Sequence, residues 1–219
     1  YGLAAVSITR LSLEEAPKPP STTSVWTEIG EGLQVLKQVP SVRGAMLHLV
    51  LLYSLLAALY VLALQLAALI DSLGPSGFGA LLAMSGVGMA IGAVVIAQAG
   101  HRFSRRRLSA TGLGTITWTL VLLSQLRGSL GFTLGLCGIL GVGAALVAIP
   151  AQTTIQEETP ESERGRVFGL QNNLINIALS LPLVLAGTLV SSIGLQPVLL
   201  LLAGLALTAA LLERPWQRC

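Results

Sequence analysis

Charged and aromatic residues are scarce in this sequence. Asp, Glu, Lys and Arg together make up 11% of the 219 residues, whereas a soluble globular domain carries about 25%. Aromatic residues make up 5%, the hydrophobic share is 53%, and the mean hydropathy is +0.77. This composition excludes an ordinary soluble domain and indicates a membrane protein.

Residues for catalysis or metal binding are also missing in any recognisable pattern. Two cysteines, Cys137 within an apolar run and Cys219, provide neither a disulfide framework nor metal-ligand spacing. We expect Cys137 to be a small buried residue. The histidines, His48 and His101, form no His-x-x-x-His pair, and no Gly-x-Ser-x-Gly motif occurs. The sequence therefore predicts no enzyme, no metal and no cofactor.

Long apolar runs are what the chain does have, and residues 77–99 form the clearest one. About 20 apolar residues can cross the hydrocarbon core as one helix. The run stops at four arginines that cannot cross and therefore mark the cytoplasmic side: Arg102, Arg105, Arg106 and Arg107. Its glycines remove side-chain bulk and predict close approach of another helix: Gly79, Gly86, Gly88 and Gly92.

Six such runs predict an all-α polytopic membrane protein, built as a six-helix transmembrane bundle. They cover residues 44–70, 77–99, 108–126, 130–155, 167–190 and 195–212. All basic residues except Arg127 then fall on one side, so both ends of the block are predicted to be cytoplasmic in an inner or plasma membrane. Because the bases sit at helix ends rather than in a stripe with aromatics, the net charge of +3 does not indicate nucleic acid.

The flanking segments suggest a piece of a longer protein. Residues 1–10 resemble the end of a preceding transmembrane helix, residues 11–43 form a cytoplasmic linker, and 213–219 form a cytoplasmic tail. Within the linker, Trp26, Ile29, Leu33 and Leu36 recur at helical spacing. This amphipathic helix lies either in the headgroup region or against other cytoplasmic segments.

No Asp, Glu, Lys or Arg lies deep in the six predicted spans, so the polar groups there are neutral. Asn173, Asn176 and Ser180 share one helical face of the fifth span. Such a stripe either hydrogen-bonds a neighbouring helix or lines a wet cavity. Gln152 and Tyr53 are further candidates to line a cavity, next to the lipid bilayer that surrounds the bundle.

Three segments together resemble the C-terminal half of a major facilitator superfamily transporter. Residues 99–107 are similar to the family's cytoplasmic signature Gly-x-Leu-Ala-Asp-Arg-x-Gly-Arg-Arg, matching it at Arg102, Arg105 and Arg106. Ala97, His101 and Ser104 replace the first Gly, the Asp and the second Gly. Residues 158–168 resemble the Pro-x-x-x-Arg-Gly-Arg-Val segment of the enterobactin and macrolide exporter-like branch, and residues 26–43 resemble its central loop.

This resemblance implies half of a twelve-helix fold, with the six spans as helices seven to twelve. It implies a secondary transporter that exports small amphiphilic molecules and works by rocking against an N-terminal six-helix half absent from this sequence. The proton-coupling carboxylate is then expected in that half. The arginine loop is expected to gate the cytoplasmic side, and Arg164 and Arg166 are expected to hold their loop inside and to pair with acids of the other half.

The alternative is a membrane protein that does not transport. A six-helix scaffold, or a half-size protein that homodimerises, fits the same hydropathy. A stable and active dimer of this chain alone would favour that reading, whereas six further spans with a buried acid upstream of Tyr1 would favour the transporter.

Overall fold

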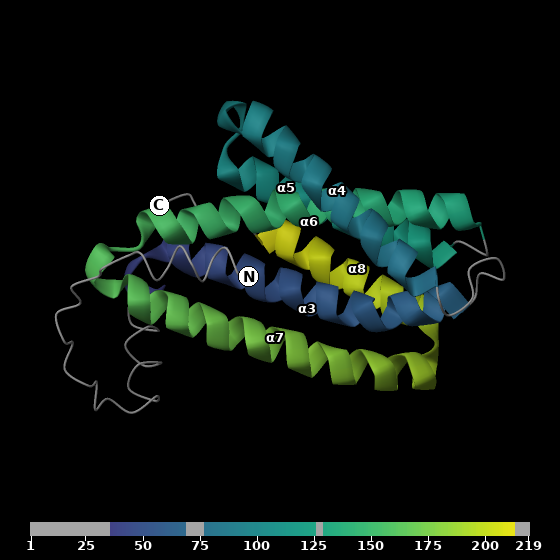
Figure 1. Ribbon diagram of the computed structural model, residues 1–219. Helices are drawn as coiled ribbons and strands as arrows, with labels where there is room; N and C mark the ends of the chain where they lie inside the picture. The colour runs from purple at the N-terminus through teal and green to yellow at the C-terminus, as the bar shows by residue number, and fades with distance from the viewer. Residues whose placement is uncertain (1–35, 69–76, 126–128, 213–219) are drawn as a thin grey trace, which may run out of the picture.

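The computed structural model describes residues 36–68, 77–125 and 129–212 (Figure 1). The described α-helices are α3 (Pro40–Ala68), α4 (Phe78–Ala99), α5 (Arg105–Gln125), α6 (Leu130–Glu158), α7 (Arg164–Ile193) and α8 (Leu195–Leu212). Two short 3-10 helices, η2 (Gly100–Arg102) and η3 (Glu161–Glu163), precede α5 and α7. These ranges contain no strand, so the predicted all-α class is confirmed. The predictions for residues 1–35, Arg127 and 213–219 fall outside the described residues.

Among the described residues, five segments are long and apolar enough to cross a membrane: α3, α4, α6, η3 with α7, and α8. Helix α5 is not among them, because four threonines lower its hydropathy. Their hydroxyls donate to backbone carbonyls of the same helix; Thr115 Oγ1, for example, lies 2.8 Å from the Thr111 carbonyl oxygen. Hydroxyls satisfied in this way are tolerated in lipid. A six-span arrangement stays a prediction, with which α5 is compatible.

The helices interleave as two triplets, α3–α5 and α6–α8. Helices α4 and α5 pack on α6, α3 packs on both α6 and α7, and α5 packs on α8. In Figure 1, α3 lies beside α7, while α4 crosses α6 on the other side. The second helix of each triplet thus packs on the first helix of the other triplet. Such reciprocal packing is what an inverted-topology repeat produces.

Side chains from both triplets share the buried core. The larger cluster joins α3, α5, α6, α7 and α8 through residues such as Leu55, Ile116 and Leu140. A second cluster joins the start of α3, the end of α6 and the start of α7 through Met46, Ile155 and Val167. The end of the bundle that holds this second cluster also carries the charged residues at the termini of these helices. It is called the arginine-rich end below.

Glycines allow α4 and α6 to meet backbone to backbone. A Cβ atom on Gly88 would lie 1.9 Å from the Gly138 carbonyl oxygen, and one on Gly141 would lie 2.0 Å from the Ser85 carbonyl oxygen. One on Gly92 would lie 2.7 Å from Ala145 Cβ. The predicted close approach is confirmed at Gly88 and Gly92. At Gly79 and Gly86, which lie off the crossing point with α6, no atom of the described residues would come within 4 Å of an added Cβ, and close approach of another helix there stays a prediction.

Candidate functional site

Arg105 connects α5 to α6 at the arginine-rich end. Ser104 precedes the helix, and its Oγ accepts a hydrogen bond from the Arg107 backbone N–H at 3.3 Å, which is an N-cap. A helix that begins at Arg105 places this arginine on the face that packs on α6. Ser104 therefore has a structural role as the N-cap of α5.

The partners of Arg105 are the last residues of α6. Its guanidinium forms an ion pair with Glu157, lies 3.6 Å from Glu158 Oε1, and donates to Thr154 Oγ1 at 3.5 Å. The Arg105 side chain is 42% exposed, and an ion pair this exposed contributes about 0–1 kcal/mol to stability. The contact is therefore better suited to holding two helix ends in register than to stabilising the fold.

The other predicted arginines differ in their surroundings. Arg164 lies 3.6 Å from Glu161 Oε1, and Arg166 donates to Glu163 Oε2 at 2.8 Å, so both pair with acids one turn earlier. Pairing of these two with another half of the protein stays a prediction. Arg106 is half-buried and has a partner, whereas Arg102 is exposed. Arg107 is exposed on the far side of α5.

The predicted polar stripe of α7 is uncovered. Asn173, Asn176 and Ser180 are all exposed, and Ser180 Oγ donates to the Asn176 carbonyl oxygen of the same helix at 2.8 Å. Within the described ranges, neither asparagine side chain bonds to another helix. Only 17% of the most apolar window of α7 is buried, against 50% for α6. The stripe thus faces away from the helices described here.

Gln152 reaches α7 through a residue that sequence reasoning missed. Gln171 Nε2 donates to Gln152 Oε1 at 2.7 Å. Gln171 is 8% exposed, and its Oε1 has no partner within the described residues. One signal was available: Gln171 shares a helical face with the buried Val167 and Ala178, where a polar side chain is unexpected. Tyr53 is half-buried beside the second core cluster.

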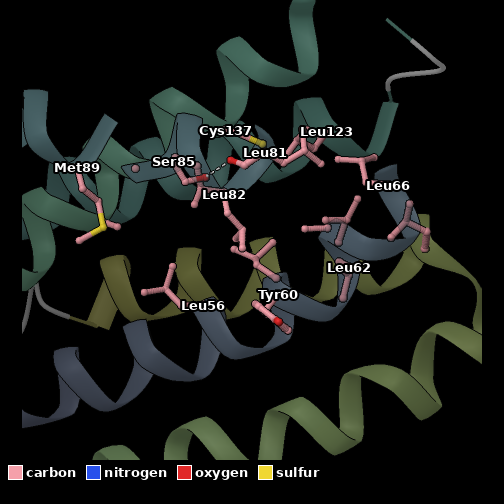
Figure 2. A pocket seen from close by; sticks show the side chains of 17 residues that line it. Leu56, Tyr60, Leu62, Leu66, Leu81, Leu82, Ser85, Met89, Leu123 and Cys137 are labelled. Carbon is pink, nitrogen blue, oxygen red and sulfur yellow. Dashed lines mark hydrogen bonds between the residues drawn. The ribbon is translucent and has the colours of Figure 1, made fainter. Parts of the chain in front are cut away.

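An apolar pocket lies between α3, α4 and α6, away from the arginine-rich end (Figure 2). Its volume is about 100 Å³, and Leu56, Leu66 and Leu81 are typical of its lining. The ring of Tyr60 meets Phe78 edge to face with centroids 5.0 Å apart. The predicted burial of Cys137 is confirmed, and this residue also lines the pocket. The pocket could not be predicted from the sequence, because its leucines resemble those of any span.

Comparison with known proteins identifies the family. Residues 46–216 match the model described as Major Facilitator Superfamily. The chain belongs to the major facilitator superfamily. It is therefore a multi-pass membrane protein of a transporter family rather than an enzyme family, as predicted.

Two curated relatives have sequences similar to this superfamily chain. An uncharacterized MFS-type transporter, YfiS of Bacillus subtilis, is 30% identical over 195 residues, which are 84% of this chain and 45% of YfiS. The multidrug efflux pump Tap of Mycolicibacterium fortuitum is 30% identical over 209 residues, which are 92% of this chain and 49% of Tap. The chain thus spans about half the length of the curated relatives it matches. Its assignment to the C-terminal half and to the enterobactin and macrolide exporter-like branch stays a prediction.

Proposed function

We propose that the protein is a secondary active transporter that exports small amphiphilic molecules by alternating access. In this proposal the chain forms the C-terminal six-helix half, which rocks against an N-terminal half. Membership of the superfamily and the similarity to a protein named as a multidrug efflux pump support it. The observation that carries it is the uncovered polar stripe of α7.

The stripe is costly if it faces lipid. A side-chain amide moved into hydrocarbon without a partner loses the hydrogen bonds that water provides, at about 2–7 kcal/mol. Asn173 and Asn176 are exposed in the middle of an apolar helix, next to Ile177, which is 57% exposed. A water-filled cavity between two halves satisfies the amides and leaves apolar surface beside them. A cavity wall that combines amides with apolar side chains suits a substrate that is amphiphilic and uncharged.

Coupling is proposed to depend on a carboxylate elsewhere in the protein. In the described helices every Asp, Glu, Lys and Arg lies in the terminal turns at the arginine-rich end. None is therefore placed to carry a proton at mid-membrane depth in these helices. We place the arginine-rich end on the cytoplasmic side, where Arg105 with Glu157 and Glu158 forms one element of a gate. Arg102 and Arg106 are proposed to contact the other half when this gate closes.

The test is transport by the full-length protein in inside-out vesicles, with lipophilic fluorescent dyes of different charge as probes. We expect uptake that depends on an imposed proton gradient and stops with a protonophore. Substitution of Asn176→Leu is expected to lower uptake, while Ser192→Ala, an exposed hydroxyl near the opposite end of α7, leaves it unchanged. Uptake without any gradient would contradict the proposal of secondary active transport. Uptake by a dimer of this chain alone would favour the homodimerising alternative.

A further inference from the structure

Two arginines at the start of α5 lie on opposite faces of the helix. At about 100° per residue, Arg105 shares its face with Gly112, Ile116 and Leu123, which are all buried. Arg107 is rotated by about 200° from Arg105. It shares its face with residues that are exposed along the whole helix: Thr111, Gly114, Trp118 and Gln125. Arg105 therefore points toward α6, and Arg107 points away from the helices that pack on α5.

Arg107 also differs from its neighbours in its charge balance. Arg105, Arg164 and Arg166 each have a carboxylate of the same chain within 4 Å. The Arg107 guanidinium has no partner within the described ranges, although its backbone N–H binds Ser104. An anion from outside the described chain can therefore bind it without displacing an internal acid.

The face that carries Arg107 has the dimensions of a lipid-facing surface. Arg107 and Gln125 stand about 27 Å apart along the axis, close to the roughly 30 Å thickness of the hydrocarbon core. Between them, Trp118 is 67% exposed, and the Thr111 hydroxyl is satisfied by the Leu108 carbonyl oxygen at 2.9 Å. With Trp118 near the centre of the bilayer, Arg107 reaches the level of the headgroups.

We propose that Arg107 binds the phosphate of an anionic phospholipid in the leaflet at the arginine-rich end. A guanidinium suits this partner because its N–H groups can donate two parallel hydrogen bonds to phosphate oxygens. The negative surface of such a leaflet attracts each nearby arginine. The lipid site follows from which face of α5 is left exposed by its packing, and it does not depend on what the protein transports.

The experiment uses Trp118 as the reporter in the full-length protein, with Trp26→Phe, Trp216→Phe and any other tryptophan replaced. The protein is reconstituted in vesicles of phosphatidylcholine with phosphatidylglycerol, either of which carries brominated acyl chains that quench tryptophan. We expect brominated phosphatidylglycerol to bind beside Trp118 roughly fivefold better than brominated phosphatidylcholine. Arg107→Gln is expected to abolish this preference, and Arg107→Lys to retain part of it.

Lys37→Gln is the matched control, since it removes one exposed positive charge elsewhere and should leave the preference unchanged. Added inorganic phosphate should also leave it unchanged, and its loss would identify a free anion as the ligand. An unaltered preference in Arg107→Gln would overturn the proposal. Trp118 that neither lipid quenches would show that protein covers this face, which would overturn it as well.

Discussion

Helices α4 and α7 occupy corresponding places in the two triplets but are packed differently. Both are little covered, with 17% of the most apolar window buried in each. Helix α4 meets α6 through glycines at backbone distance, and its exposed face is apolar, with Val87, Ile91 and Val94 about half exposed. Helix α7 packs on α3 through ordinary side chains, and its exposed face carries the asparagine stripe.

The difference indicates that the exposed helices α4 and α7 have different roles. The α4–α6 contact has no room for adjustment, so these helices are expected to move as one body. Within the described residues, helix α7 contacts α6 through side chains only: the Gln171–Gln152 hydrogen bond and apolar residues of the second core cluster, such as Ile155 and Val167. A helix face whose neighbours change during transport is therefore better placed on α7 than on α4.

The largest effect is expected at the glycine contact. Gly88→Ala would put a Cβ atom 1.9 Å from the Gly138 carbonyl oxygen, and backbone cannot yield as a flexible side chain does. We expect a loss of about 3 kcal/mol or more in stability, seen as a fall in thermal unfolding temperature and in the yield of monodisperse protein. Gly86→Ala, on the same helix with open space around it, should be neutral or slightly stabilising. Equal behaviour of the two variants would refute the tight contact.

The second test concerns the ion pair that links the first triplet to the second. Arg105→Glu places a third carboxylate beside Glu157 and Glu158, so we expect transport to fall about tenfold with membrane insertion intact. Glu157→Arg in the same protein should restore much of the lost transport.

The triple change of Arg102, Arg105 and Arg106 to Gln should also reduce transport. Full activity in the triple variant would leave these arginines only a role in topology.

A smaller and more selective effect is expected on α7. Asn173→Leu or Asn176→Leu should change stability by less than about 0.5 kcal/mol, because neither amide bonds to another helix in the described structure. The KM for an amphiphilic dye should rise several-fold, as measured in vesicles. A large loss of stability with unchanged KM would assign the stripe to packing instead of a cavity.

The smallest effect is expected at Arg166. Arg166→Glu breaks an exposed pair with Glu163, which contributes at most about 1 kcal/mol. If Arg166 also contacts the other half, accessibility of a cysteine placed in the cytoplasmic vestibule should rise two- to threefold with a modest loss of transport. An unchanged accessibility would mean that this contact does not form.

The sequence predicted the helices, the burial of Cys137 and the family, because apolar runs and basic loops are local patterns. It could not choose among the glycines: Gly88 and Gly86 look alike until the crossing point with α6 is known. It also gave no partner for Arg105, since Glu157 is 52 residues away. Helix boundaries mattered here, because α5 begins at Arg105 and α6 continues to Glu158, beyond the predicted ends of both spans.

The candidate site was predictable only where polarity stood out against an apolar background. Asn173 and Asn176 were found in this way. Gln171 was overlooked, because its significance lies in its burial and in its bond to Gln152 on a different helix. The pocket of leucines between α3, α4 and α6 gave no signal, since its existence depends on how helices diverge rather than on which residues they carry.

The interleaving of the triplets bears on how the protein is made. Helices α3, α4 and α5 leave the ribosome before α6, the helix on which all three pack, and they make few contacts with one another. They must therefore wait in the membrane as weakly associated helices until α6 enters. Helix α3 waits longer, since it also packs on α7, and α5 completes its contacts only with α8. Assembly of this bundle is thus a late event in which the first three helices and the last three close on each other together.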